Sequence, residues 1–426
     1  MSLKTASVKV AKKVLPRKQL RRLRANYRVA RARTLGARYG HPAKKLKIIA
    51  ITGTNGKTTT ANYINEILKT AGQKTSMFST AIIEIAGKRE PNQLNLTVPP
   101  VATLQKFFRA SAKQGVEYCI IEATSQALDQ KKFLGVPIFM AVMTNLTQDH
   151  LDYHHDMQHY ATAKSNIFRN KPTYIVLNRD DEYFDYFNRF QPKTSKVSYG
   201  RHSAADFHIN HSILYRSGAE AFVSQDRTHF ELATYIPGEF NVYNMAAAAA
   251  ACSLLGIPAE TIADGIAELD KLPGRYEVLQ TDTPYSIVVD YAHTPDALRR
   301  LLKSARETSL GRVILVFGCM GERDRTKRSE MGKIANEFAD IIFVTDEEND
   351  REPRAKIRAE IITDIKNSPK VTEIDGREHA IHAALAAAKK NDTILITGLG
   401  HETYHTLDGK RIPWSDQKIV KKLLSN

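Results

Sequence analysis

A glycine turn followed by lysine and threonines is the stretch of the sequence best suited to chemistry. Gly53–Thr60 follows the apolar run Ile48–Ile51 and precedes Ala61–Leu68, which has the character of a helix. In such a strand–turn–helix unit, backbone N–H groups and the helix N-terminus face an anion, a lysine adds charge, and a hydroxyl can hold Mg²⁺. The sequence therefore predicts that the chain binds a nucleoside triphosphate. The strict pattern has a glycine where Ile51 stands, so a plain glycine turn is the alternative.

Two further polar clusters follow apolar runs. Glu122 closes the run Tyr118–Glu122, and a carboxylate at the carboxyl end of a parallel strand beside a phosphate site can hold Mg²⁺. The segment Thr144–His154 gathers carboxamide, carboxylate and imidazole groups, a set that suits metal-assisted or phosphate-linked chemistry. A solvated strand end and a capped helix start are the respective structural alternatives.

The elements that would position these residues alternate between strand and helix from residue 47 onward. In the first series the predicted strands are residues 47–52, 118–122, 138–144 and 174–178, with helical stretches such as 101–114 and 157–169 between them. Residues 205–235 are strand-like but irregular, and residues 244–255 are rich in alanine and helical in character. A second series has predicted strands at residues 286–290, 313–318, 341–345 and 393–398. This alternation predicts an α/β protein with a mostly parallel sheet.

Composition bounds the number of domains and the class of protein. A chain of 426 residues is long enough for two or three domains, and 42% hydrophobic with 25% charged residues is ordinary for a globular protein. No apolar run approaches the roughly 18 residues of a membrane-spanning helix, and the start of the chain does not predict a secretory signal. The three cysteines are widely spaced, which fits a reducing cytoplasm rather than a disulfide framework or a metal site.

The net charge of +16 is concentrated at the N-terminus. Residues 1–47 hold 16 of the 62 Lys and Arg residues and no Asp or Glu, and the rest of the chain has 46 residues of each sign. Leu20, Leu23, Tyr27 and Ala30 recur at helical spacing within this arm. A basic amphipathic helix indicates an anionic membrane surface, nucleic acid or an acidic partner, of which we favour the membrane surface over nucleic acid. A helix packed on the body with its charges in solvent is the alternative.

Taken in order, the motifs resemble those of the Mur ligase family, the ATP-dependent ligases of peptidoglycan synthesis. The stretches that carry the resemblance are Gly53–Thr60, Thr144–His154, Ala163-Lys164, Gly238–Asn244, Pro273–Arg275, Val289–Asp296 and Gly398–Tyr404. The pattern is most similar to the MurE type, which adds the third amino acid to UDP-MurNAc-dipeptide. The resemblance implies a central P-loop-type ATPase domain and a C-terminal Rossmann-like α/β domain that closes over ATP. We therefore expect a basic helical arm in residues 1–46, the central domain in 47–273 and the C-terminal domain in 274–426.

The resemblance also implies a reaction. In the family, ATP phosphorylates a peptide carboxylate, an amine attacks the acyl phosphate, and phosphate leaves, so the enzyme mainly neutralises and aligns charge. Lys57 would hold the β- and γ-phosphates, and Thr58 would hold Mg²⁺. Glu122 and His150 match metal positions of the family. Lys164 matches a lysine that family members carbamylate, which gives a carboxylate for a second Mg²⁺.

Binding positions follow from the same resemblance. Those for the nucleotide are Gly53, Thr54, Asn55, Gly56, Lys57, Thr58, Thr59, Asn241, Asn244, Arg275 and Asp290, with the two asparagines on the adenine side. Those for the acceptor and the amino acid are Thr97, Thr124, Ser125, Asp346, Glu347, Gly400 and Glu402.

The sequence departs from the family's pattern at its start and at the substrate positions. Family members carry an N-terminal domain that grips the UDP moiety, whereas 52 residues without a βαβ pattern precede Gly53. We therefore expect that the acceptor is not held through a uridine nucleotide, or that another chain supplies that contact. Thr97–Pro99 and Ala123–Leu128 differ from the family's versions. Substrate recognition is thus predicted to have changed more than ATP recognition.

An acidic run distinguishes the predicted amino-acid site. Thr345–Pro353 stands where MurE enzymes specific for meso-diaminopimelate have Asp-Asn-Pro-Arg, whose arginine pairs with the distal carboxylate. By charge matching, an acidic pocket would favour a cationic amine such as lysine or ornithine. A solvated loop is the alternative.

Three functions are compatible with these features. The first is a cytoplasmic ATP-dependent carboxylate–amine ligase of MurE type, located at the inner membrane face through the arm. The second keeps the chemistry but changes the acceptor, to a folylpolyglutamate-type substrate or a lipid-linked muropeptide. A Mur-like amidating partner would carry a four-cysteine zinc site, which three scattered cysteines do not supply. The third is a non-catalytic, ATP-binding scaffold, against which the retention of Lys57, Glu122, His150 and Lys164 weighs.

Overall fold

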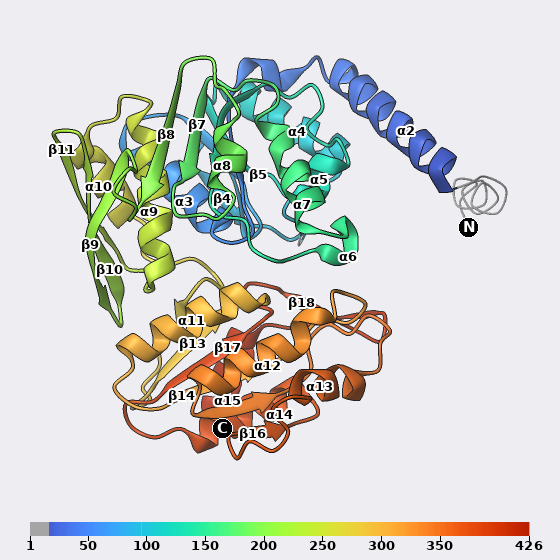
Figure 1. Cartoon of the computed structure of the whole chain (residues 1–426), viewed down its shortest axis with the longest axis vertical. Coiled ribbons are helices and arrows are strands. Elements are labelled where there is room, and N and C mark those ends of the chain that lie inside the picture. The colour runs from blue at the N-terminus through green and yellow to red at the C-terminus, as the bar shows by residue number, and fades with distance from the viewer. Residues whose placement is uncertain (1–16, 95, 426) are drawn as a thin grey trace.

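Two α/β units lie one above the other, and a single helix projects from the first (Figure 1). The computed structural model describes residues 17–94 and 96–425. The described part of the basic arm is helical, as predicted: α2 (Arg17–Arg38) is followed by the short turn η1 (Pro42–Lys45), which leads into β1. Residues 1–16 of the predicted arm lie outside the described residues. Within residues 17–94 and 96–425, no helix is both long and apolar enough to cross a bilayer.

The first unit is built on an eleven-stranded sheet with a parallel centre. Its strand order is β11-β10-β9-β8-β7-β6-β1-β5-β2-β3-β4. The parallel strands are β1 (Lys47–Thr52), β2 (Thr75–Phe78), β5 (Tyr118–Glu122), β6 (Ile138–Met143), β7 (Tyr174–Asn178) and β8 (Ser195–Gly200). Strands β3 (Ile82–Ile85) and β4 (Lys88–Pro91) extend the sheet at one edge. The mostly parallel sheet predicted from the sequence is confirmed.

The strands at the other edge are more regular than predicted. Residues 205–235, predicted to be strand-like but irregular, form the regular strands β9 (Phe207–Tyr215), β10 (Gly218–Gln225) and β11 (Thr228–Thr234). They pair antiparallel with one another, and β9 joins β8 in parallel. Buried and exposed residues alternate along β11, because one face of this part of the sheet covers α9 and α10 and the other meets solvent.

Helices cover both faces of the central strands. Ile49 and Ile51 of β1 belong to the core under one set of helices, while Ile48 and Ala50 belong to the core under the other set. One set is α3 (Lys57–Thr70), α9 (Glu239–Ser253) and α10 (Ala259–Ala267); the other includes α4 (Val101–Lys113), α5 (Ser125–Asp129) and α7 (Met157–Lys164). The short helices α6 (Leu151–His154) and α8 (Phe184–Asn188) and the turn η2 (Ser165–Ile167) complete the unit. Burial on both faces explains why β1 reads as a continuous apolar run.

The second unit is a smaller α/β layer. Its sheet has the order β12-β13-β17-β14-β15-β16, parallel except for β12. The strands are β12 (Glu277–Val278), β13 (Ser286–Asp290), β14 (Val313–Phe317), β15 (Ile341–Val344), β16 (Val371–Glu373) and β17 (Thr393–Thr397), with the hairpin β18 (Tyr404–Leu407) and β19 (Lys410–Pro413) beside it. The helices are α11 (Pro295–Thr308), α12 (Thr326–Phe338), α13 (Arg354–Ile362), α14 (Arg377–Ala387) and α15 (Asp416–Leu424).

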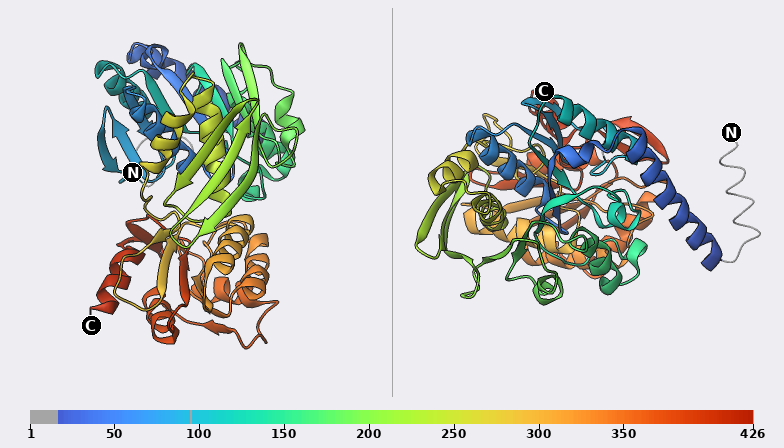
Figure 2. Two further views of the ribbon diagram at one scale, coloured as in Figure 1. Left: turned by 90° about the vertical axis from the view of Figure 1, so that its left-hand side faces the viewer. Right: turned by 90° about the horizontal axis from the view of Figure 1, so that it is seen from above.

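The carboxyl ends of the two parallel sheets face each other (Figures 1 and 2). The loop after β1 meets the start of α11, where Asn55 donates a hydrogen bond to Asp296 at 2.8 Å. Arg275, which precedes β12, donates to the hydroxyl of Thr58 at 3.2 Å. Open α/β sheets bind ligands beyond the carboxyl ends of their strands, so the space between the units is the place to look for a site. All three cysteines, Cys119, Cys252 and Cys319, are buried, and none lines the cavity described below.

Candidate active site

Two glycines shape the loop between β1 and α3. Gly53 has a φ of 154° and Gly56 a φ of 82°, in the region that favours glycine. A Cβ on Gly56 would overlap the side-chain oxygen of Asn244, and one on Gly53 would overlap the hydroxyl of Thr144. Helix α3 then begins at Lys57 without a side-chain cap from the described chain. Its first N–H groups are therefore available to an anion, as the sequence predicted.

Two lysines converge on this loop. Lys57 Nζ donates to the carbonyl oxygens of Gly53 at 2.9 Å and Thr54 at 2.8 Å. Lys164, at the end of α7, donates to the same Gly53 oxygen at 2.7 Å and lies 4.5 Å from the ring centroid of Tyr160. Burial lowers the pKa of Lys57, and burial together with the charge of Lys57 holds the pKa of Lys164 well below its ordinary value. Lys164 thus has the character of a buried amine that is easily neutralised.

A carboxylate and a line of hydroxyl groups lie beside the loop. Glu122, at the end of β5, is fully buried and accepts hydrogen bonds from Thr58 Oγ1 at 2.9 Å and from the Thr80 backbone N–H at 2.6 Å. The Thr80 hydroxyl donates to Glu122 at 3.0 Å and shares a further hydrogen bond of 2.9 Å with the hydroxyl of Thr97. The line connects the predicted Mg²⁺ position at Thr58 with the predicted acceptor position at Thr97.

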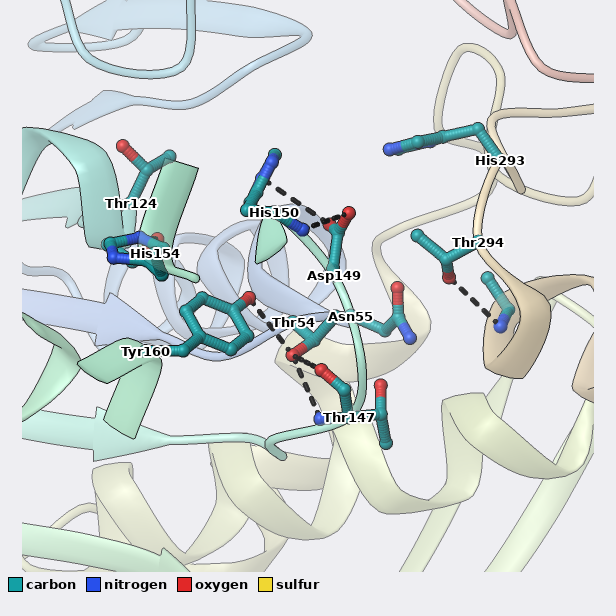
Figure 3. A network of polar contacts seen from close by, with 12 residues as sticks. Thr54, Asn55, Thr124, Thr147, Asp149, His150, His154, Tyr160, His293 and Thr294 are labelled. Carbon is teal, nitrogen blue, oxygen red and sulfur yellow. Dashed lines mark hydrogen bonds and ion pairs between the residues drawn. The ribbon is translucent and has the colours of Figure 1, made fainter. Parts of the chain in front are cut away.

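An acid–imidazole pair lies opposite the second unit (Figure 3). His150 Nε2 is 3.3 Å from Asp149 Oδ2, and His150 adopts a φ of 55°. Burial lowers the pKa of His150. Burial alone would raise the pKa of Asp149, but His150, His293 and Lys327 bring it down to about 2. His293, from the loop after β13, points toward Asp149 across the gap between the units.

Neighbouring polar contacts fix the helices that carry these groups. His154 of α6 shares a hydrogen bond of 2.9 Å with Ser125 of α5, and Thr124 caps α5 by accepting from Ala127 N at 3.3 Å. Tyr160 shares a hydrogen bond of 3.2 Å with the hydroxyl of Thr54 in the phosphate loop (Figure 3). Ser125, predicted to meet substrate, is therefore engaged by His154 in holding α5 to α6.

Some of the predicted nucleotide residues line the cavity, and others support those that do. Asn244 lines the cavity, whereas Asn241 is buried behind it, donating to Pro237 O at 2.7 Å and accepting from Asn244 at 2.9 Å. In the second unit, Arg275 stacks 4.7 Å from the ring centroid of Tyr291. Asp290 accepts two backbone hydrogen bonds of 2.7 Å that hold the turn around it, and burial raises its pKa.

A cavity of about 380 Å³ between the units brings most of the predicted residues together. Those that line it are Thr54, Asn55, Gly56, Lys57, Thr58, Thr59, Thr97, Glu122, Thr124, His150, Asn244, Arg275 and Asp290. Those outside its lining are Gly53, Ser125, Lys164, Asn241, Asp346, Glu347, Gly400 and Glu402. Sequence reasoning missed Thr80, which lies in a short loop after β2 and belongs to none of the recognised motifs. Asp149 and His293 did belong to recognised motifs, and their spacing in those motifs was the available signal.

The predicted amino-acid residues lie in the second unit, away from the cavity lining. Asp346 forms ion pairs with Arg354 and Arg358, so its charge is already balanced. Glu347 is 2% exposed, and its carboxylate has no hydrogen-bond partner within residues 17–94 and 96–425. Burial raises its pKa to about 7. Gly398, which follows β17, packs against this carboxylate so closely that a Cβ would overlap it.

The arrangement defines a class of enzyme in which two α/β units enclose a phosphate loop, a buried carboxylate and a basic residue from each unit. Comparison with known proteins gives the family. The model of the Mur ligase middle domain matches residues 51–252, and that of the Mur ligase, glutamate ligase domain matches residues 274–400. The chain belongs to the Mur ligase family, and it is a ligase of the acid–amino-acid class, as the sequence predicted.

Individual relatives agree with this assignment. The UDP-N-acetylmuramoyl-L-alanyl-D-glutamate–2,6-diaminopimelate ligase of Clostridium botulinum is 36% identical over 388 residues, which cover 91% of this chain and 79% of the relative. The enzyme of the same name from Bacillus velezensis is 37% identical over 398 residues, covering 91% and 80%. A solved structure with this name matches at a TM-score of 0.65 and 31% identity, covering 95% of this chain and 82% of that one. MurF from Acinetobacter baumannii, at a TM-score of 0.72 and 17% identity, supports the fold alone.

Proposed function

We propose that the protein joins an amino acid to the carboxylate of a muramyl peptide at the expense of ATP. The observation that carries this proposal is the meeting of the glycine cradle and Lys57 with Thr58, Glu122 and Arg275 around one cavity. When bound, ATP would supply the phosphoryl group that activates the acceptor carboxylate. The chain's own contribution is to hold negative charge: backbone N–H groups and Lys57 from the first unit, and Arg275 from the second.

Magnesium would be held at the same place. Thr58 and Glu122 offer a hydroxyl and a carboxylate 2.9 Å apart, oxygen groups of the kind that Mg²⁺ prefers. No three His, Cys, Asp or Glu side chains converge on one point in the described residues. We therefore propose that Thr58 and Glu122 form the core of the site, and that His150 and a carbamylated Lys164 join a second ion only once substrate is bound.

For the amino acid, we propose a cationic substrate such as lysine or ornithine. Asp346 is balanced by arginines, whereas Glu347 is a buried carboxylate beside Gly398 that makes no hydrogen bond within the described residues. An ammonium group would supply the missing donors. The named relatives use 2,6-diaminopimelate, which is the direct competitor. Equal concentrations of lysine, ornithine and meso-diaminopimelate should give mainly the lysine or ornithine product, and preferential use of diaminopimelate would refute the proposal.

For the acceptor and the location, we propose a muramyl peptide and a cytoplasmic site of action at the membrane surface. Supporting observations are the three buried free thiols, as expected in a reducing compartment, and the basic helix α2. The alternative acceptor is a folylpolyglutamate-type substrate, whose enzyme from Mycobacterium tuberculosis shares the fold at a TM-score of 0.71.

Orthophosphate release tests the reaction. Wild-type protein with ATP and Mg²⁺ should release phosphate only when both an amino acid and a muramyl-peptide acceptor are present. A panel of acceptors with and without the uridine nucleotide, together with a folyl acceptor, identifies the acceptor class. Phosphate release that is independent of any amine would contradict the ligase assignment, and binding of ATP without turnover on any acceptor would favour a scaffold.

A further inference from the structure

Helix α2 has a high density of positive charge. Its 22 residues include eight arginines and one lysine and no acidic residue. Outside this segment and the rest of the N-terminal arm, positive and negative residues balance. Nine of the 16 basic residues of this arm thus lie on one projecting element (Figure 1).

The described part of α2 has two opposite apolar faces. Ala32 and Gly36 are buried and Val29 is half-buried, and this inner face packs against α4. Leu23 and Tyr27, one helical turn apart, lie on the other side and are 54% and 58% exposed. Spacing places them about opposite to Ala32 and Gly36 on the helix. The outer face is therefore apolar and is not covered by the body of the protein.

Exposed arginines border this outer face on both sides. At about 100° per residue, Arg24 and Arg31 fall on one side of the stripe formed by Leu23 and Tyr27, and Arg33 falls on the other. All three arginines are exposed. An apolar stripe between two basic borders is the arrangement of a helix that lies in the interface of a bilayer carrying anionic lipids.

The helix leaves the body at the acceptor end of the cavity. Arg28 lies 3.9 Å from Asp129, the last residue of α5, and Asp129 accepts a hydrogen bond of 2.8 Å from Tyr153 of α6. The next residues, Gln130 and Lys132, line the cavity. In Figures 1 and 2, α2 runs outward from this side of the molecule, away from the strands β9–β11.

We propose that α2 docks on an anionic lipid bilayer and holds the acceptor end of the cavity at its surface, so that the protein acts on a bilayer-borne acceptor. The part that concerns the acceptor rests on the proposed ligase function. Electrostatic attraction brings the arginines to lipid phosphates, and Leu23 and Tyr27 enter the interface. The exposed leucine favours lipid over nucleic acid, because nucleic-acid sites combine basic residues with aromatic rings for base stacking.

Vesicle binding tests the docking directly. Full-length protein should sediment with vesicles of phosphatidylglycerol and phosphatidylcholine and stay in solution with phosphatidylcholine alone. The variant Arg24→Glu/Arg31→Glu should bind the anionic vesicles at least about tenfold more weakly. Leu23→Gln/Tyr27→Gln should lose the part of the binding that survives high salt. Lys418→Glu/Lys421→Glu on α15 makes the same change of net charge at exposed positions of the second unit and should bind as wild type.

Other outcomes would overturn the docking proposal. If vesicle binding weakens equally in the Arg24→Glu/Arg31→Glu and Lys418→Glu/Lys421→Glu variants, the binding depends on net charge and not on α2. Unchanged vesicle binding in the α2 variants would exclude the helix as the contact. Tighter binding of single-stranded or double-stranded nucleic acid than of anionic vesicles, lost with the same arginines, would assign α2 to nucleic acid. If the wild type forms dimers and the Leu23→Gln/Tyr27→Gln variant does not, the apolar stripe binds a second copy of the chain rather than a bilayer.

Turnover tests the consequence for the acceptor. On a soluble muramyl peptide, Arg24→Glu/Arg31→Glu should match the kcat/KM of wild type. On the same peptide carried by a lipid diphosphate in anionic vesicles, its kcat/KM should fall by about tenfold or more. Equal kcat/KM for both proteins on the vesicle-borne acceptor would overturn the proposal. Failure of wild type on every acceptor would instead refute the ligase function, while the vesicle-binding result would still stand.

Discussion

Lys57 and Lys164 share a carbonyl oxygen but differ in what they can do. Lys57 lines the cavity where the phosphates are predicted to bind, whereas Lys164 is buried behind the loop with its pKa held well below the ordinary value. A neutral amine reacts with carbon dioxide, and a protonated one does not. The structure therefore supports the prediction, drawn from the family resemblance, that Lys164 is carbamylated.

Removing Lys164 should be reversible by a small acid. Lys164→Ala is expected to lower kcat by about 10²–10³-fold, because a charge placed for the transition state is lost. Acetate or propionate should restore a measurable fraction of the activity. Lys57→Ala is the matched control, since its function is cationic and a carboxylate cannot replace it. Full activity of Lys164→Ala, or equal rescue of both variants, would contradict carbamylation.

A comparison of Gly56 with Gly72 distinguishes the cost of a left-handed backbone from the cost of steric overlap. Gly56 and Gly72 have similar φ values, 82° and 74°, but a Cβ on Gly72 would meet no atom within 4 Å. Both Gly→Ala changes should cost about 1–2 kcal/mol of stability from the left-handed conformation. Only Gly56→Ala should also weaken nucleotide binding, measured by calorimetry, because its Cβ would displace Asn244. Equal nucleotide affinity in the two variants would argue against the loop as the phosphate site.

Glu347 makes stability depend on pH. Its pKa is about 7 in the folded protein against 4.5 ordinarily, so the folded state holds the extra proton. Stability is therefore expected to fall as pH rises from about 4.5 to 7, in total by on the order of 3 kcal/mol. Glu347→Gln, which keeps the shape without the charge, should be more stable than wild type above pH 7 and should flatten the profile in denaturant titrations. An unchanged profile would show that Glu347 is paired in solution.

At the residue scale, the sequence revealed groups that belong to short motifs and missed those assembled by folding. The phosphate loop was recognisable because its function needs consecutive residues. The Thr80 contact with Glu122 was not, because 42 residues separate them along the chain. The acidic character of residues 346–352 was visible, but the arginines that balance Asp346 come from α13.

At the scale of elements, α3 and α10 approach each other through a glycine. A Cβ on Gly265 of α10 would overlap the backbone of Ile67 in α3, the helix whose first turn faces the phosphate site. In an open helix, Gly→Ala stabilises by up to about 1 kcal/mol. Here Gly265→Ala should instead lower the melting temperature, because the two helices must separate. Asp264→Ala, at the exposed neighbouring position, should leave the melting temperature the same or raise it. A stabilised Gly265→Ala would contradict this packing.

Strands and helices of the central layers were predictable, since each is a continuous apolar run or a helical repeat. Predicted strand 47–52 coincides with β1, and predicted helix 101–114 ends one residue beyond α4. The antiparallel strands β9, β10 and β11 were harder to recognise. Their solvent-facing residues include His211, Ile213 and Tyr215, so polar and apolar residues do not separate cleanly by alternation.

At the scale of the whole molecule, scattered polar contacts link the two units, among them Asn55–Asp296, Arg275–Thr58 and Arg216–Ser286. Asp296 accepts from Asn55 at 2.8 Å and also pairs with Arg300, and Arg275 reaches Thr58. Hydrogen bonds to charged groups contribute about 1.5–3 kcal/mol each. The relative position of the units is therefore sensitive to single substitutions, which sequence motifs could not reveal because the partners come from different units.

Asp296→Ala should loosen the contact between the units. We expect a larger radius of gyration in solution scattering and a KM for ATP raised by about tenfold, because Asn55 loses its partner across the cavity. Glu330→Ala removes an acidic group at an exposed position of α12 and should change neither quantity. A radius and a KM equal to those of wild type would show that other contacts determine closure.

The reactivity of the three buried cysteines can report where the folded protein opens. Burial raises the pKa of Cys119 and of Cys319 to about 12 and raises that of Cys252 as well, so each thiol reacts with a labelling reagent only when its surroundings open. Cys119 and Cys252 belong to the first unit and Cys319 to the second. Labelling under native conditions, resolved by mass spectrometry, would therefore show which unit opens first and whether ATP slows both equally, without any introduced probe.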